Sequence, residues 1–282
     1  MKLSVVWATR NEEANIGRSI SSVKRIADEM IVVDENSTDK TREVAKQMGA
    51  KVVTEPHHAI FHITKQKAID LAKGDWVLQM DADEVISEKL SEDIKKVITD
   101  QKPSFNSKLE KLFKRHQALI EARDGAIGKP DGEIVAYFIP RLNMFLGKPL
   151  VHAGVYPDPA IRLIKNGKAH FPAKSVHEIM SVDGRVGWLY SNMEHYDSPT
   201  LGRYLGRLNR YTDLQVQELK VKGVTKNTLS FIKYIFFKPL YTFLNLYFRH
   251  LGFLDGPQGF LWSFFSASHF PISYFKYLTT KQ

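Results

Sequence analysis

The chain has 282 residues, of which 43% are hydrophobic and 25% are charged, and it contains no cysteine. This composition can supply a globular core, and it excludes both a disulfide framework and a thiolate metal site. A net charge of +9 indicates an anionic partner, which could be nucleic acid, anionic lipid or a diphosphate-bearing substrate. No secretion signal is visible at the N-terminus, and together with the absence of cysteine this predicts a cytoplasmic protein.

The first hundred residues alternate between predicted strands and predicted helices. Apolar, β-branched runs predict strands at residues 3–8, 29–34, 51–54 and 75–80, and helical periodicity predicts helices at about 12–26, 40–48 and 64–72. Glu12 and Glu13 are expected in the first turn of the first helix. Such alternation with short connections predicts an α/β fold with a mainly parallel sheet covered by helices.

Polar side chains gather where these strands end, and ligands of such sheets bind beyond the carboxyl ends of the strands. The polar residues expected there are Thr9, Asn11, Glu12, Asp34, Asn36, Asp81 and Asp83. Each acid alone could be a helix-dipole residue, a turn former or a cap, but their convergence on one edge favours a binding site. The turn at residues 9–13 has no glycine, which excludes the pyrophosphate turn of dinucleotide-binding dehydrogenases.

The segment Asp81-Ala82-Asp83-Glu84 places three acids directly after a buried strand. Three neighbouring carboxylates repel one another unless a cation or hydrogen-bond donors neutralise them. Mg²⁺ or Mn²⁺ meets that need and also binds diphosphate oxygens. The alternative is that these acids only begin the next helix.

Three segments in order, VVWATRNEEANI, IVVDENSTDKT and AKGDWVLQMDADE, resemble the N-terminal half of inverting family 2 glycosyltransferases with the GT-A fold. The resemblance covers about residues 3–90 and implies a nucleotide-sugar donor, with a UDP-sugar favoured, and a divalent metal. The residues implied to line the base and ribose pocket are Thr9, Asn11, Glu12 and Asp34, with Lys65 or Gln66 nearby. Asp81 is implied to contact the ribose or a metal-bound water, and Asp83 to ligate the metal.

The middle of the chain, residues 101–132, is polar and basic with a narrow apolar stripe. A solvated helix or a surface excursion is the favoured interpretation, and an acceptor-facing lid is the alternative. A strand is predicted at residues 133–139, and Pro140 is expected to end it.

The series Tyr156-Pro157-Asp158, Arg162-Leu163 and His177-Glu178 is similar to a subset of the family that includes lipopolysaccharide-core glucosyltransferases. This resemblance extends to about residue 215 and implies a saccharide or lipid-linked acceptor in cell-envelope glycan synthesis. We therefore predict a catalytic domain at residues 1–215, with its nucleotide-sugar half at about 1–100 and its acceptor half at about 133–215.

Many family members carry a late Glu-Asp pair whose aspartate is the general base. The Glu-Asp pair here, Glu92-Asp93, follows the acidic segment and is expected on a surface helix. Glu178 is our predicted base and Asp158 the second choice, because a base must reach the acceptor hydroxyl. A structural ion pair with Arg162 is the alternative for Glu178.

His195 is a candidate second metal ligand, although a lone histidine is more often structural. The arginines at positions 203, 207 and 210 recur at helical spacing, as a solvated basic face or as a phosphate-binding stripe.

Residues 216–282 are predicted to be helical, and from Leu229 onward aromatic side chains mix with lysine and arginine. No apolar run is long enough to span a bilayer, and Pro239 would kink one. We predict helices that bind peripherally to the inner face of the cytoplasmic membrane. Packing against the catalytic domain or a homodimer is the alternative, and the absence of a recognition motif argues against nucleic acid. The rival function is a non-catalytic, membrane-associated nucleotide-sugar binder.

Overall fold

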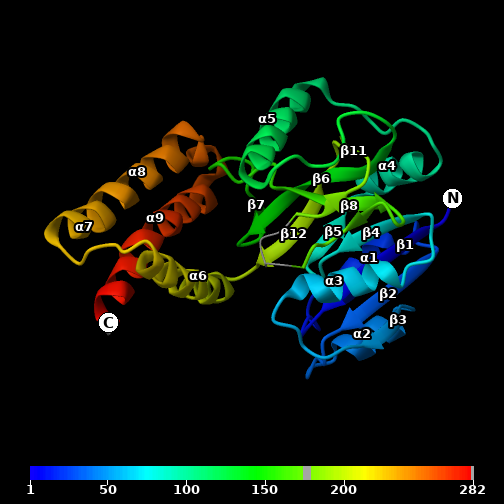
Figure 1. Cartoon of the computed structure of the whole chain (residues 1–282), viewed down its shortest axis with the longest axis horizontal. Coiled ribbons are helices and arrows are strands. Elements are labelled where there is room, and N and C mark those ends of the chain that lie inside the picture. The colour runs from blue at the N-terminus through cyan, green and yellow to red at the C-terminus, as the bar shows by residue number, and fades with distance from the viewer. Residues whose placement is uncertain (174–178, 281–282) are drawn as a thin grey trace. The chain divides into compact units, whose positions relative to one another are not determined.

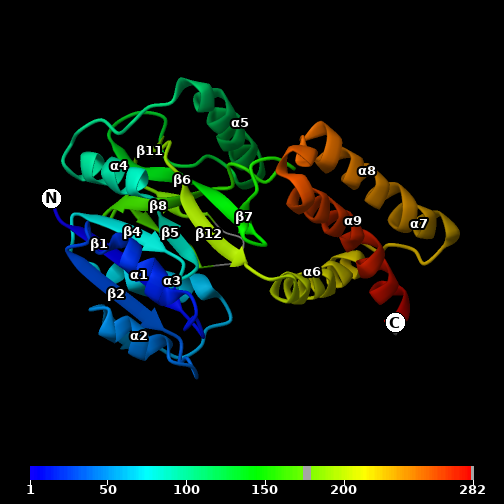
Figure 2. The ribbon, with the colours of Figure 1, turned by 180° about the vertical axis from the view of Figure 1, so that it is seen from behind.

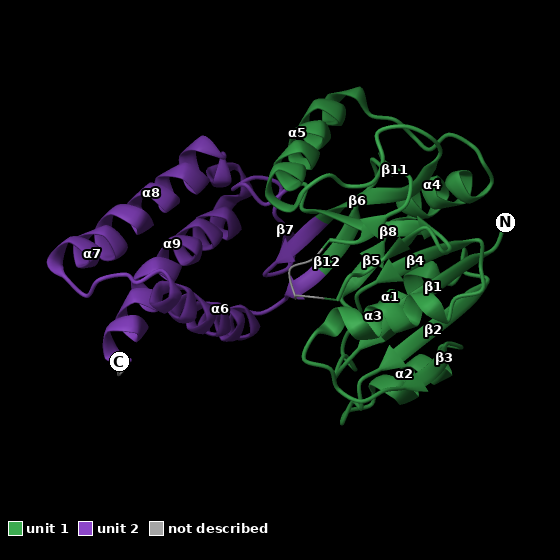
Figure 3. Ribbon diagram, in the orientation of Figure 1, with its two compact units in different colours: residues 1–141, 157–195 green, residues 142–156, 196–282 purple. Residues whose placement is uncertain are grey.

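The computed structural model describes residues 1–173 and 179–280, which form two compact units (Figure 3). Unit 1 comprises Met1–Arg141 and Pro157–His195, and unit 2 comprises Leu142–Tyr156 and Tyr196–Gln282. The predicted division of the chain at residue 215 stays a prediction.

Unit 1 begins with four parallel strands connected by helices (Figure 1). The strands are β1 (Leu3–Thr9), β2 (Glu29–Asp34), β3 (Lys51–Thr54) and β4 (Trp76–Met80), and the helices are α1 (Ile16–Val23), α2 (Thr41–Gln47) and α3 (Phe61–Asp70). β1 pairs in parallel with both β2 and β4, and β2 pairs in parallel with β3. The predicted parallel sheet is confirmed.

Beyond β4 the sheet continues with antiparallel strands from later in the chain. Within the described residues the strand order is β3-β2-β1-β4-β8-β6-β12-β5. The later strands are β5 (Glu84–Ile86), β6 (Ile134–Phe145), β8 (Pro159–Lys165) and β12 (Met193–Ser198). β5 follows β4 closely in the chain but stands at the end of this order, so the acidic segment joins two strands that are separated in the strand order and close in the chain, as the curl of the sheet allows (Figure 2).

The remaining elements before unit 2's helices are short strands and two helices, all in unit 1 except β7, which belongs to unit 2. They are α4 (Glu88–Ile98), α5 (Ser107–Asp124), β7 (Lys148–Pro149), β9 (Ala169–His170), β10 (Ser181–Val182) and β11 (Arg185–Trp188).

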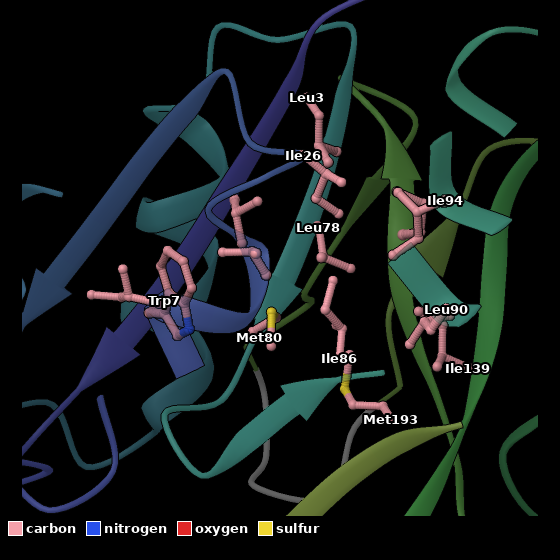
Figure 4. Close-up of a cluster of buried hydrophobic side chains, with 14 of the residues drawn as sticks. Leu3, Trp7, Ile26, Leu78, Met80, Ile86, Leu90, Ile94, Ile139 and Met193 are labelled. Carbon is pink, nitrogen blue, oxygen red and sulfur yellow. The ribbon is translucent and has the colours of Figure 1, made fainter. Parts of the chain in front are cut away.

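The core of unit 1 lies on both faces of the sheet because side chains alternate along each strand. Leu3, Trp7 and Leu78 point to one face, where α1 and α4 cover them (Figure 4). Val6 and Val77 point to the other face and pack with buried residues of α3. Burial of both faces explains why β1 and β4 read as continuous apolar runs in the sequence.

The first helix begins later than predicted, at Ile16, so Glu12 and Glu13 precede it. Their backbone N–H groups donate to Thr41 Oγ1 and to Asp39 Oδ2, across the loop that follows β2. Bonds between the two loops therefore replace the predicted first turn of the helix.

Two further expectations are wrong. Pro140 does not end its strand, because β6 runs through it to Phe145, and Pro140 stands opposite Pro159, the first residue of β8. Neither proline of this pair has an N–H to donate, and the next N–H, of Arg141, donates to Pro157 O. Asp93 lies on a helix as expected, but it is fully buried, and it accepts from Ser191 Oγ at 2.6 Å and from Ser104 N at 2.9 Å.

Unit 2 is helical outside its strand segments, as predicted for the C-terminal region. Its helices are α6 (Leu201–Val221), α7 (Thr228–Ile232), α8 (Lys238–Leu244) and α9 (Gly256–Thr279), with π-helical turns at Lys233–Phe237 and Asn245–Arg249. Tyr234 stacks on Tyr274 with ring centroids 5.2 Å apart. No helix among the described residues is long and apolar enough to cross a membrane.

Candidate active site

The loops after β1 and β2 are held together side by side at the carboxyl edge of the sheet. Asn11 has a left-handed backbone, with φ of 55°, and its Oδ1 accepts from Thr38 N at 2.8 Å. Asn11 N in turn donates to Ser37 Oγ at 2.8 Å. Asparagine tolerates this conformation better than most residues, so the glycine-free turn is built without strain.

Thr9 and Asp34 end β1 and β2 and stand opposite each other in the parallel register. Thr9 Oγ1 donates to Asp34 Oδ2 at 3.0 Å, and Ser37 donates to both carboxylate oxygens of Asp34. Thr9 and Asp34 are both fully buried. This bonding shapes the loop after β2, and the implied contact of these residues with a nucleotide stays a prediction.

Asp81 belongs to a chain of alternating, buried or partly buried charges that begins at Lys65. Lys65 Nζ lies 2.5 Å from Asp81 Oδ1, and Arg162 Nη2 lies 2.6 Å from Asp81 Oδ2. The same Arg162 nitrogen lies 2.6 Å from Glu84 Oε1, and Glu84 is fully buried.

The chain of charges continues from Glu84 through Arg141 to Asp158. Arg141 Nη1 lies 3.6 Å from Glu84 Oε1, and Arg141 Nη2 lies 2.9 Å from Asp158 Oδ2. Asp158 has a left-handed backbone, with φ of 39°, just before β8. Three cations and three acids therefore alternate from Lys65 to Asp158.

The electrostatics of this chain keep Asp81 ionised. Burial alone would raise the pKa of Asp81, but Arg162 and then Lys65 outweigh burial and hold this pKa well below its usual value. Burial lowers the pKa of Lys65, and the carboxylate of Asp81 opposes that effect only in part. Burial would lower the pKa of Arg162 too, but Asp81 and Glu84 raise it, so the guanidinium is permanently charged.

A cavity of about 290 Å³ opens beside this chain at the carboxyl edge of the sheet. It is lined by Ala8, Arg10, Glu12, Phe61, Asp81, Ala82, Asp83 and His195. Asp83 Oδ1 lies 3.6 Å from Nε2 of His195, because β12 pairs with β5 and sets His195 opposite Glu84. The predicted neighbourhood of Asp83 and His195 is thus present in the fold.

The donor atoms of Asp83 and His195 fit a divalent cation. Burial lowers the pKa of His195, more than the neighbouring Asp83 raises it, so the imidazole is neutral at pH 7 and keeps a lone pair for a metal. Asp81 is already bound to Lys65 and Arg162. No cluster of three or more metal-binding side chains occurs among the described residues, and Asp83 and His195 are the pair that could contribute ligand atoms to a cation here.

The predicted site residues divide into those at the cavity and those that support it. Glu12, Asp81, Asp83 and His195 line the cavity. Lys65 instead supports Asp81, and Gln66 accepts from Phe171 N at 2.7 Å. Glu178 lies outside the described residues. Asp158 belongs to the chain of charges through Arg141.

The sequence analysis did not identify the cations that pair with the acids, above all Arg141. It also did not identify the residues that hold Arg10 in place. Arg10 Nη1 lies 2.8 Å from His57 Nε2, and His57 Nδ1 lies 2.6 Å from the buried Glu35. The available signal was the count of charges, because three acids after a buried strand require buried cations, and Arg162 stands between apolar residues in the buried part of its strand.

The chain thus has a curled α/β sheet with two aspartates and a histidine at its carboxyl edge, and the comparisons with known proteins identify the class of enzyme to which this fold belongs. The sequence profile described as "Glycosyl transferase family 2" matches residues 4–137. A glycosyltransferase of Rickettsia typhi is 30% identical over 269 residues, covering 92% of this chain and 81% of the relative. The chain belongs to glycosyltransferase family 2, and its fold is GT-A.

Two further similarities span the chain. The lipopolysaccharide core biosynthesis glycosyltransferase LpsC of Rhizobium meliloti is 26% identical over 282 residues, covering 95% of this chain and 91% of LpsC. The solved mannosyltransferase PcManGT of Pyrobaculum calidifontis, in complex with GDP-Man and Mn²⁺, is 13% identical with a TM-score of 0.49, covering 100% of this chain and 88% of that one.

Proposed function

We propose that this glycosyltransferase moves a sugar from a nucleoside-diphosphate donor, a UDP-sugar by preference, to a saccharide or lipid-linked acceptor with inversion. The observation that carries the proposal is the cavity in which Asp83 and His195 meet beside Asp81. Its acids suit a cation bound to a diphosphate, and Arg10 at the same cavity suits the phosphates themselves. The similarity to LpsC supports a role in cell-envelope glycan synthesis.

In the proposed reaction each set of residues has a separate role. Asp83 and His195 would hold a Mn²⁺ or Mg²⁺ ion, and such an ion would supply positive charge to stabilise the departing diphosphate. Lys65 and Arg162 hold the Asp81 carboxylate in one position at the cavity. A carboxylate, Glu178 first and Asp158 second, accepts the proton of the acceptor hydroxyl as that oxygen attacks the anomeric carbon. A single displacement of this kind inverts that carbon.

We also propose that unit 2 holds the enzyme to the inner face of the cytoplasmic membrane. Large apolar side chains from α7 to α9 and on the π-helical turns between them are exposed, for example Phe237 at 69% and Tyr241 at 67%. Lys233 and Arg249 lie on these π-helical turns, and Lys238 is the first residue of α8. Aromatic insertion combined with attraction to anionic lipid is how such surfaces bind bilayers.

The test is turnover followed by product stereochemistry. Purified protein with Mn²⁺ is offered a panel of UDP- and GDP-sugars and a membrane extract as acceptor source, and release of the nucleoside diphosphate is measured. The anomeric configuration of the product is then read from its NMR coupling constants. We expect release with one donor and an inverted product. Donor binding without turnover on any acceptor would identify a binding protein, and retention would contradict single displacement.

A further inference from the structure

A second cavity of about 310 Å³ lies in unit 1 on the face of the sheet that carries α3 and α5. Residues of α3, α5, β6 and β8 line it. Asp81 lines this cavity and also the cavity that contains Asp83 and His195. The two cavities therefore adjoin the same carboxylate.

The lining of the second cavity is strongly cationic. Lys65, Arg123, Arg141 and Arg162 line it, and Asp81 is its only acidic lining residue in the described part of the chain. Glu84, which forms ion pairs with both Arg162 and Arg141, is fully buried and is not among the lining residues. Asp158 and Asp124, which pair with Arg141 and Arg123, do not line the cavity either, so its surface presents more cations than acids although each cation has an acidic partner.

Arg162, which lines this cavity, carries one buried donor without an acceptor among the described residues. The Arg162 side chain is only 6% exposed, its Nη atoms bind Gln79, Asp81 and Glu84, and its Nε–H has no acceptor among the described residues. A buried N–H without an acceptor costs free energy, which an oxygen of a bound ligand would recover. The ligand that suits this lining is an oxyanion, because guanidinium groups bind carboxylates and phosphates with paired, charge-assisted hydrogen bonds.

Arg123 supplies a second, accessible cation from the last turn of α5. Its side chain is 70% exposed, and the partner that the structure gives it is its neighbour Asp124, at 2.6 Å. A surface pair of adjacent residues contributes little to stability, so Arg123 can turn to a ligand at small cost. Apolar side chains such as Phe138 and Ile161 complete the wall, which suits the ring faces of a sugar.

We infer that this cavity binds an anionic group of the acceptor, so that the acceptor is a sugar carrying a phosphate or a carboxylate. The inference rests on the proposed function, which assigns the donor diphosphate to the cavity of Asp83 and His195. The acceptor then lies on the other side of Asp81 and directs its hydroxyl toward the donor. Both oxyanions present the same chemistry to arginine, and the experiment distinguishes them.

The test uses three monosaccharides that differ in one group: glucose, glucose 6-phosphate and glucuronate. Each is titrated into the full chain saturated with UDP and Mn²⁺, and also into the protein without UDP, with binding followed by calorimetry. We expect one of the two anions to bind at least ~10-fold more tightly than glucose. The tighter of the two identifies the anionic group.

Arg123→Gln should weaken the preferred anion by about fivefold or more, because it removes one charge-assisted contact. Arg115→Gln is the matched control: Arg115 is exposed on the same helix and does not line the cavity. Thermal unfolding should confirm that both variants fold. Equal weakening by both variants, or anions no tighter than glucose, would overturn the inference.

Displacement of the sugar phosphate by UDP and Mn²⁺ would also overturn it, because the anion would then occupy the donor cavity. The two proposals fail separately. Stabilisation by UDP and Mn²⁺ tests the donor site alone, and the titrations without UDP decide the ligand of the second cavity even if no nucleotide binds.

Discussion

At the scale of single residues, the site depends on an arginine that touches no reacting atom in our account. Arg162 contacts Asp81 and Glu84 at 2.6 Å each, and both the arginine and Glu84 are buried. Buried ion pairs add little net stability when complete, but loss of one partner leaves an uncompensated charge in a medium of low polarity. The position of Asp81 and the stability of unit 1 are therefore linked through this side chain.

Replacing Arg162 should destabilise the fold strongly. Arg162→Met keeps an unbranched apolar stem but leaves Asp81 and Glu84 without their shared cation, so we expect a loss of about 3–5 kcal/mol in the free energy of unfolding. Arg185→Met is the control, since Arg185 is an exposed arginine in β11 of the same unit. Urea unfolding measures both, and a loss below about 1 kcal/mol for Arg162→Met would show that the network is unimportant for stability.

The general base is the second prediction at this scale. Glu178→Gln retains shape but cannot accept a proton, so kcat should fall at least ~100-fold while donor affinity stays unchanged. Asp158→Asn is the paired variant, because Asp158 is bound to Arg141. If Glu178→Gln remains active and Asp158→Asn loses kcat, the role belongs to Asp158.

At the scale of elements, the site depends on the crossing from β4 to β5. The acidic segment leaves the centre of the sheet, and β5 then pairs with β12 at the far end of the strand order, with His195 opposite Glu84. α4 follows β5 immediately and begins at Glu88. The start of α4 therefore sets where β5 ends. Asp83 directly precedes β5, and the pairing of β5 with β12 brings it close to His195.

Ser87 caps α4, and its removal should loosen this junction. Ser87 Oγ accepts from Leu90 N at 3.1 Å and also donates to Asn192 O, beside β12. Ser87→Ala should cost about 1 kcal/mol of stability. Ser91→Ala, within the same helix, should change stability by less than about 0.5 kcal/mol. Thermal unfolding compares the two, and equal effects would contradict a capping role.

Some helices and strands could be predicted from the sequence, and others could not. The strands at 29–34 and 51–54 match β2 and β3 because short apolar runs between turn residues have one ready interpretation. The start of α1 and the extension of β6 through Pro140 were mispredicted, since both depend on bonds to distant loops and strands. Asp83 was placed from its motif, but its proximity to His195 needed the β5–β12 register, which local pattern does not encode.

At the scale of the whole molecule, unit 2 carries an exposed apolar surface that bears on the location of the enzyme in the cell. Its helices pack through inner aromatic residues such as Tyr234 and Tyr274. Other large apolar side chains on the same helices remain exposed. An exposed apolar surface of this kind is typical of a membrane or a subunit interface.

Introducing a charge on this surface should weaken membrane binding. Phe237→Asp should reduce association with anionic vesicles at least ~10-fold, because it removes apolar insertion and repels the lipid. Leu119→Asp is the control, as Leu119 on α5 is 58% exposed but belongs to unit 1. High salt should weaken binding by the intact protein without abolishing it. If the protein does not bind vesicles and instead sediments as a dimer that Phe237→Asp dissociates, the surface is a subunit interface.

The central claim is that Asp83 and His195 hold a cation that binds the donor diphosphate, and thermal unfolding with UDP tests it most directly. UDP at 100 times its Kd should stabilise the protein by about 2.7 kcal/mol with Mn²⁺ present, and by much less with EDTA. Asp83→Asn should lose the Mn²⁺-dependent part of this stabilisation, whereas Glu92→Gln, an exposed acid on α4, should keep it. Full Mn²⁺-dependent stabilisation of Asp83→Asn by UDP would contradict the account.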